Sequence, residues 1–120
     1  MFASRPLTPA ERNLAVSMLE RAPASGSEYL QQLARAQAST WRCPCGCASF
    51  NLHIPDLPSP EGPLEVLADF VFGSESTLAG AFVFARNGIL SGVEIYGLAG
   101  DAPAELPLPS ALRPFASAAQ

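Results

Sequence analysis

The chain has 120 residues, of which 48% are apolar and 15% are charged, and its formal net charge is −4. This acidic balance argues against binding to nucleic acid or to an anionic membrane surface, because both partners require a basic patch. All seven basic residues are arginine, so the chain lacks the lysine that Schiff-base chemistry and a phosphate-binding P-loop need.

No apolar segment approaches the length of about 18 residues or more that a membrane-spanning helix requires. The first residues also lack the apolar core of a secretory signal. We therefore expect a single cytoplasmic domain, in which cysteines are normally reduced rather than paired in disulfides.

The first predicted element is an amphipathic helix over about residues 9–22. Thr8 can cap its start, Pro9 suits the first turn and Glu11 completes a capping box. Apolar residues then recur at helical spacing, and Pro23 is expected to end the helix because the residue before a proline avoids the α conformation.

A second helix is predicted over about residues 27–38. Ser25 or Ser27 can cap it, and Glu28 suits the positive end of its dipole. Because the connection between the two helices is short, they should be neighbours.

The segment from Arg42 to Cys47 has the sequence Arg-Cys-Pro-Cys-Gly-Cys and contains all three cysteines of the chain. Its proline and glycine interrupt regular pairing, so we expect a turn or bulge. The alternating pattern from Ala48 to Ile54 predicts a strand, and residues 55–63, which include four prolines, predict a stiff loop.

Three further strands are predicted over 64–72, 77–86 and 89–98. In the first, Val66, Ala68, Phe70 and Phe72 should share one face. Asn87-Gly88 lies between the last two strands and predicts a two-residue type I′ hairpin.

The hairpin turn also predicts a register, with Arg86 opposite Ile89 and Phe82 opposite Val93. This register places Glu94 and Tyr96 on the face that carries alanines 79, 81 and 85. Because small side chains allow close approach, we expect the two helices to cover that face.

The predicted fold class is therefore α+β, with two N-terminal helices packed on an antiparallel sheet of about four to five strands. The β part spans about residues 40–98, and its strands are expected in a meander. An extended C-terminal tail follows over 99–120, with one helical turn near Ser110.

The cysteine cluster is the leading candidate for a metal site. Thiolates at this spacing can share a soft metal ion, with zinc or copper(I) as the natural guest. His53 is the only histidine, but six residues of extended strand separate it from Cys47 by roughly 20 Å. The alternatives are a site with Cys43, Cys45 and Cys47 alone, a site shared across a homodimer, a disulfide, and a structural turn that binds nothing.

A second candidate is a binding face formed by Glu94, Tyr96 and His53. Asp69, Glu94 and Tyr96 can also converge on a sheet face, where a carboxylate pair can serve acid–base chemistry, but neither a nucleophile motif nor a diagnostic carboxylate spacing accompanies them. We therefore predict no catalytic residues and favour a protein that is not an enzyme.

Two stretches together resemble a group of small bacterial proteins that have no established activity. They are Cys45 to Leu52, with its C-G-C turn, and Asn87 to Tyr96, with its N-G hairpin followed by L-S-G-V-E-I-Y. The resemblance covers about the second half of the chain and implies a small bacterial domain, but it assigns no functional residues.

The favoured function is a non-enzymatic protein-binding or regulatory module of the immunity-protein type, whose acidic balance suits a basic partner. This expectation rests partly on analogy between folds. The favoured function requires no cofactor, and we expect neither nucleic acid nor a membrane as a partner. The alternative is a thiol or metal-binding protein that uses the cysteine cluster, with zinc as the expected ion.

Overall fold

The computed structural model describes residues 3–22 and 26–115. Its two helices are α1 (Pro9–Glu20) and α2 (Gly26–Leu33). The predicted capping box is confirmed, because Thr8 accepts a hydrogen bond from the Glu11 backbone and the Glu11 carboxylate accepts one from the Thr8 backbone. Helix α1 ends at Glu20 with Arg21 as its C-cap, about two residues before the predicted end at 22. Pro23 and the expected cap at Ser25 lie outside the described residues.

The second helix is shorter than the predicted span of 27–38. It ends at Leu33, and strand β2 (Gln37–Ser39) follows where helix was expected. Ala38 is fully buried and lies opposite Leu52 of β3. Pairing with the sheet therefore overrides the weak local preference of this segment for helix.

The sheet of the described residues has seven antiparallel strands, not the predicted four to five, in the order β1-β2-β3-β6-β5-β4-β7. The strands are β1 (Ser4–Arg5), β2, β3 (Phe50–His53), β4 (Leu64–Phe72), β5 (Ala79–Arg86), β6 (Ile89–Gly97) and β7 (Arg113–Pro114). Strands β1, β2 and β7 are only two or three residues long. Such short strands carry no periodic signal in the sequence.

The predicted meander is correct only for β4, β5 and β6. Strand β3 pairs with β6 rather than with β4, through Phe50 opposite Val93. The helical turn predicted near Ser110 is present as a 3-10 turn, η2 (Pro109–Ala111), but the tail expected to be extended then forms β7 on the free edge of β4. A further 3-10 turn, η1 (Glu75–Thr77), connects β4 with β5.

The hairpin between β5 and β6 turns where the Asn-Gly pair predicts. Asn87 and Gly88 have φ values of 52° and 76°, and positive φ at both central residues is the requirement of a type I′ turn. Arg86 lies opposite Ile89, as predicted.

The predicted register is wrong beyond the start of this hairpin. Ala85 lies opposite Leu90 but Phe84 lies opposite Gly92, so Ser91 is an extra residue in β6. This β-bulge moves every later partner by one position and places Glu94, not Val93, opposite Phe82. Glu94 therefore lies on the face opposite to the one predicted.

A second irregularity occurs in β4, between Val66 and Ala68. It separates Val66, which is 47% exposed, from Ala68, Phe70 and Phe72, which are buried. The prediction that all four share a face is therefore wrong for Val66 alone.

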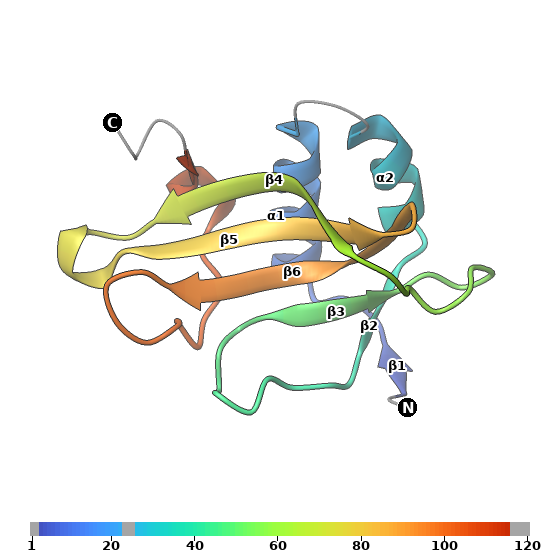
Figure 1. Cartoon of the computed structure of the whole chain (residues 1–120), viewed down its shortest axis with the longest axis horizontal. Helices are drawn as coiled ribbons and strands as arrows, with labels where there is room; N and C mark the ends of the chain where they lie inside the picture. The colour runs from blue at the N-terminus through green and yellow to red at the C-terminus, as the bar shows by residue number, and fades with distance from the viewer. Residues whose placement is uncertain (1–2, 23–25, 116–120) are drawn as a thin grey trace.

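Helices α1 and α2 lie on one face of the sheet, behind the strands in Figure 1. The alanines of β5 are fully buried there, as expected, and they join Leu14 and Met18 of α1 in the main core. The opposite face carries a row of aromatic side chains from β5 and β6: Phe82, Phe84 and Tyr96. No helix in the described residues is long and apolar enough to cross a membrane.

Candidate thiolate metal centre

The three cysteines lie on the loop between β2 and β3. A tight turn shapes this loop, because the Gly46 N–H donates to the Cys43 carbonyl at 2.9 Å. Gly46 has a φ of 85°, a conformation that glycine adopts without the steric cost that a side chain would add. The Pro-Cys-Gly sequence thus bends the chain so that consecutive cysteines approach one another.

The turn brings all three sulfur atoms together, as the sequence alone could not establish. The Sγ atoms of Cys43, Cys45 and Cys47 lie within 4.8 Å of one another. The closest pair is Cys43 Sγ and Cys45 Sγ, 2.8 Å apart, and the Cys47 N–H donates to Cys45 Sγ at 3.4 Å. Cys45 is exposed, while the other two cysteines are partly buried.

Ser49 fixes the end of this loop to the sheet. Its hydroxyl accepts a hydrogen bond from the Ile95 N–H at 2.8 Å and donates to the Ile95 carbonyl at 3.2 Å. The Cys47 thiol donates to the same hydroxyl at 3.3 Å. Ser49 is only 3% exposed, so a buried polar contact with β6 positions the third thiol.

A second attachment holds the loop on its other side. The Ala48 N–H donates to the Pro103 carbonyl at 2.9 Å, which connects the loop to the segment after β6. The sulfur cluster therefore rests on β6 and on the following segment. Its exposed side is the Pro44–Gly46 turn.

The surroundings of Cys43 and Cys47 shift the pKa values of their thiols in opposite directions. The hydrogen bond to the Cys45 sulfur raises the pKa of the Cys43 thiol to about 11. Partial burial acts to raise the pKa of Cys47, but hydrogen bonds with Ser49 and with the neighbouring thiols outweigh it and lower that pKa. The pKa of Cys47 is therefore shifted in the opposite direction to that of Cys43.

This arrangement supplies three soft donor atoms from five consecutive residues. Thiolates select soft ions such as copper(I) and zinc over hard ions such as magnesium or calcium. The backbone N–H that points at Cys45 also suits a metal-bound thiolate, because hydrogen bonds to ligand sulfur tune such sites.

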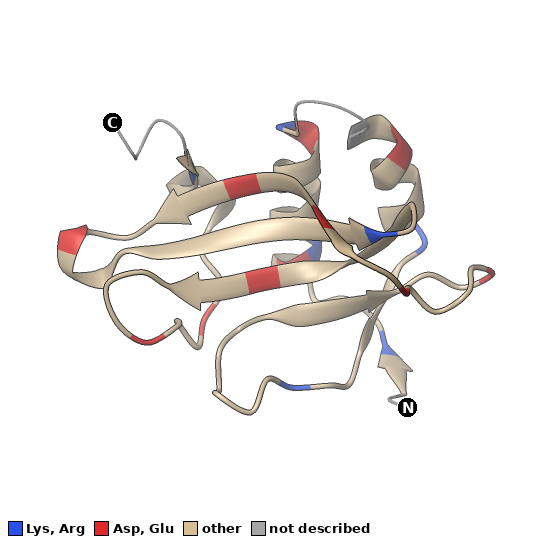
Figure 2. Cartoon of the chain, viewed as in Figure 1, with Lys and Arg blue, Asp and Glu red and all other residues tan. Residues whose placement is uncertain are grey.

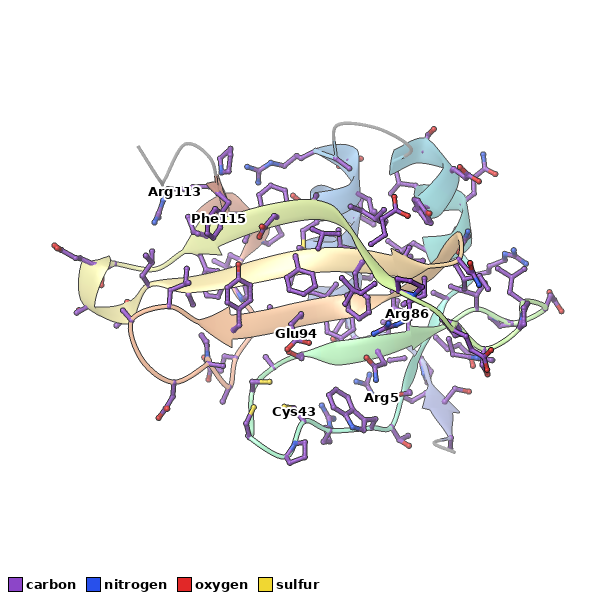
Figure 3. All side chains as sticks on the ribbon, viewed as in Figure 1. Arg5, Cys43, Arg86, Glu94, Arg113 and Phe115 are labelled. Carbon is purple, nitrogen blue, oxygen red and sulfur yellow. The ribbon has the colours of Figure 1, made fainter. Side chains whose placement is uncertain are left out.

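The polar side chains predicted as a binding face are only partly brought together. Glu94 and Tyr96 lie on the outer face of β6, away from the helices, and Figure 3 shows Glu94 on the side facing the viewer. His53 is exposed and, with Ser39, Ser59 and Pro60, lines a separate hollow of about 530 Å³. Neither His53 nor Glu94 belongs to the group of thiols.

Two of these outer groups have shifted acidities. Burial raises the pKa of Glu94, although a hydrogen bond with Ser49 acts in the opposite direction. Burial, together with the charge and hydrogen bond of Asp69, raises the pKa of Tyr96 to about 12. The Tyr96 hydroxyl donates to Asp69 Oδ1 at 3.3 Å, and its ring covers Gly80.

Sequence reasoning missed Ser49, which shapes the thiol site. Ser49 falls on the polar side of the predicted strand alternation, and only the contact with Ile95 shows that it is buried. The expected convergence of Asp69 and Tyr96 on one face is confirmed, because the two side chains meet across β5. No local sequence signal identifies the contact of Ser49 with Ile95.

A further hollow of about 580 Å³ lies beside β4. Its lining is mostly apolar and includes Val66, Phe70 and Phe115, with Arg21 and Asp69 as its charged members. Strand β7 covers the edge of β4 only at Phe70 and Val71, so Leu64 and Val66 remain 40% and 47% exposed.

Comparisons of the chain with protein-family models, with curated proteins and with solved structures gave no match.

Proposed function

We propose that this protein binds one soft metal ion through the thiolates of Cys43, Cys45 and Cys47. The observation that carries the proposal is the mutual approach of the three sulfurs to within 4.8 Å. A plain turn would not require three side chains to converge, whereas one ion bound by all three thiolates does. The attachment of the loop at Ser49 supports the proposal, because it holds the third thiol in place before an ion arrives.

The chemistry of binding follows from the different acidities of the thiols. Metal binding requires thiolates and therefore releases protons. Cys43, whose pKa is raised to about 11, must lose its proton when the ion binds, whereas the pKa of Cys47 is lowered. Apparent affinity should consequently rise with pH across the neutral range.

The test is a metal titration of the reduced, metal-free protein without oxygen. We expect one ion per chain, and we expect Cys45→Ser to weaken binding strongly because one of three donors is lost. His53→Gln is the matched control and should leave affinity unchanged, since His53 lies outside the thiol group. Absence of any bound ion while three thiols remain titratable would disprove the proposal.

A second candidate function is protein binding through the hollow beside β4. The favouring observation is the exposed apolar surface of Leu64 and Val66 next to that hollow. Figure 2 shows acidic residues on β4 and β6, and Glu65 and Asp69 belong to β4. A basic partner surface complements this charge, as the acidic composition also suggests.

This second function predicts that Val66→Arg removes a partner that the unmodified protein retains. The control is Leu98→Arg, which adds the same charge at a position of similar exposure, 45%, just after β6. Affinity capture from cells of the source organism, followed by mass spectrometry, provides the comparison. Identical partners for both variants would contradict a role for the β4 surface.

A further inference from the structure

The geometry points to monovalent copper, rather than zinc, as the ion that the thiol cluster selects. This inference rests on the proposed function and concerns the identity of its ion. It follows from the number of donors that the loop provides, from the position of the nearest other ligands, and from the exposure of the site.

The thiol loop provides fewer donors than a closed zinc site requires. Structural zinc sites are almost always four-coordinate and closed, but the group in the described residues contains three thiols and no carboxylate or imidazole. Copper(I) is soft and is well satisfied by thiolates alone. Three sulfurs that converge from one short turn can therefore complete the coordination of copper(I), whereas zinc would need a fourth ligand.

The neighbouring polar groups do not supply a fourth ligand. The Ser49 hydroxyl is occupied by the Ile95 N–H and carbonyl. Glu94 lies outside the thiol group. His53 lines a different hollow. For zinc, the fourth position would therefore be filled by water.

The thiol cluster has an exposed side. Cys45 is exposed and the flanking Pro44 and Gly46 are exposed as well. In the view of Figure 3, the labelled Cys43 lies on the loop that projects below the sheet. An ion held there is accessible to an incoming thiolate, so the site suits reversible loading and transfer of copper(I) by ligand exchange.

The experiment is a competition between the two metals under strictly anaerobic conditions. Reduced, metal-free protein receives equimolar copper(I), buffered by a copper(I) chelator, and zinc, and is then desalted for metal analysis. We expect bound copper to exceed bound zinc at least tenfold. X-ray absorption at the copper edge should show three sulfur neighbours and no nitrogen or oxygen neighbour.

Two variants distinguish the possible results of this competition between copper and zinc. Cys45→Ser should reduce the sulfur count at copper from three to two and weaken the binding of copper, without making zinc the preferred ion. Glu94→Gln keeps the shape of the side chain and should leave both metals unaffected. If zinc is retained in excess and Glu94→Gln releases it, Glu94 is the missing fourth ligand and the inference is wrong. If neither metal binds, the proposed function itself fails.

Discussion

At the scale of single residues, hydrogen bonds stabilise the negative charge of the Glu11 carboxylate. Its carboxylate receives two hydrogen bonds of 2.8 Å from Arg5 and one of 2.9 Å from the Thr8 backbone, and Glu11 is 6% exposed. It therefore caps α1 and also connects that helix to β1, which contains Arg5. Burial acts to raise the pKa of Glu11, but the hydrogen bonds and charge of Arg5 and the Thr8 contacts lower it overall.

This pKa predicts a pH dependence of stability. Because the pKa of Glu11 is lower in the folded state, its contribution is present above the ordinary glutamate pKa of about 4.3 and is lost as the pH falls through the lowered value. Glu11→Gln should cost about 2 kcal/mol of unfolding free energy at neutral pH. In urea denaturation, the difference from the unmodified protein should shrink toward zero in strong acid. A difference independent of pH would contradict the assignment.

Ser49 provides the second prediction at the residue scale. Its hydroxyl contacts the Cys47 thiol but is not itself a proposed ligand. Ser49→Ala should lower metal affinity by about 10- to 100-fold, the usual effect of losing a partner that orients a ligand, while stoichiometry stays at one ion. Ser59→Ala, an exposed position in the loop before β4, is the control for metal titration. Equal affinities of the two variants would contradict the role of Ser49.

At the scale of elements, the bulge at Ser91 decides which side chains the sheet presents on each face. Without the extra residue, the alternation after the hairpin would direct Glu94 and Tyr96 toward the helices. With it, Val93 and Ile95 are buried in the core, and the polar side chains lie on the outer face. The single extra residue in β6 thus decides which side chains of this strand enter the apolar core and which lie on the surface beside the thiol loop.

Single-residue deletions in β6 should distinguish these registers. Deletion of Ser91 removes the extra residue while Leu90 and Val93 keep their faces, so the protein should stay folded with a loss of about 1–3 kcal/mol. Deletion of Val93 leaves the bulge but exchanges the two faces of β6 between the bulge and the end of the strand. This variant should not reach a native state that unfolds cooperatively. Circular dichroism during thermal denaturation compares the two. Equal stability of the two variants would show that the bulge does not set the register.

At the scale of the whole molecule, the helices and the thiol loop depend on the sheet in different ways. Leu14 and Met18 of α1 are fully buried and pack in the core that includes β5 and β6. The thiol loop is attached instead to the Ile95 backbone and to Pro103. The helical layer therefore stabilises the sheet, while the loop rests on β6 and the segment that follows it.

Because the helices and the thiol loop contact different parts of the molecule, a substitution in the core should lower stability without changing metal binding. Leu14→Ala should lower the unfolding free energy by about 2–5 kcal/mol, the range for truncating a buried leucine. Metal stoichiometry and affinity should remain unchanged at temperatures well below the new midpoint. Calorimetric unfolding and a parallel metal titration are the measurements. Loss of metal binding in a folded Leu14→Ala protein would show that the two regions are coupled.

The sequence by itself determined the features that depend on neighbouring residues. The capping box of Thr8 and Glu11 and the turn at Asn87-Gly88 were predicted correctly, because their hydrogen bonds and φ values are set within four residues. The buried side of Phe50, Leu52 and Ile54 followed from alternation alone. The α+β class could be inferred from these local patterns.

Only the tertiary structure decided the features that depend on contacts between distant segments. The strand at Gln37–Ser39 forms because β3 supplies its hydrogen-bond partners, and the placement of Glu94 depends on the bulge at Ser91. The attachment of the thiol loop to the sheet likewise depends on the contact between Ser49 and Ile95, 46 residues further along the chain. Local propensities are worth only fractions of a kcal/mol per residue, whereas burial and pairing across the sheet sum over many residues and prevail.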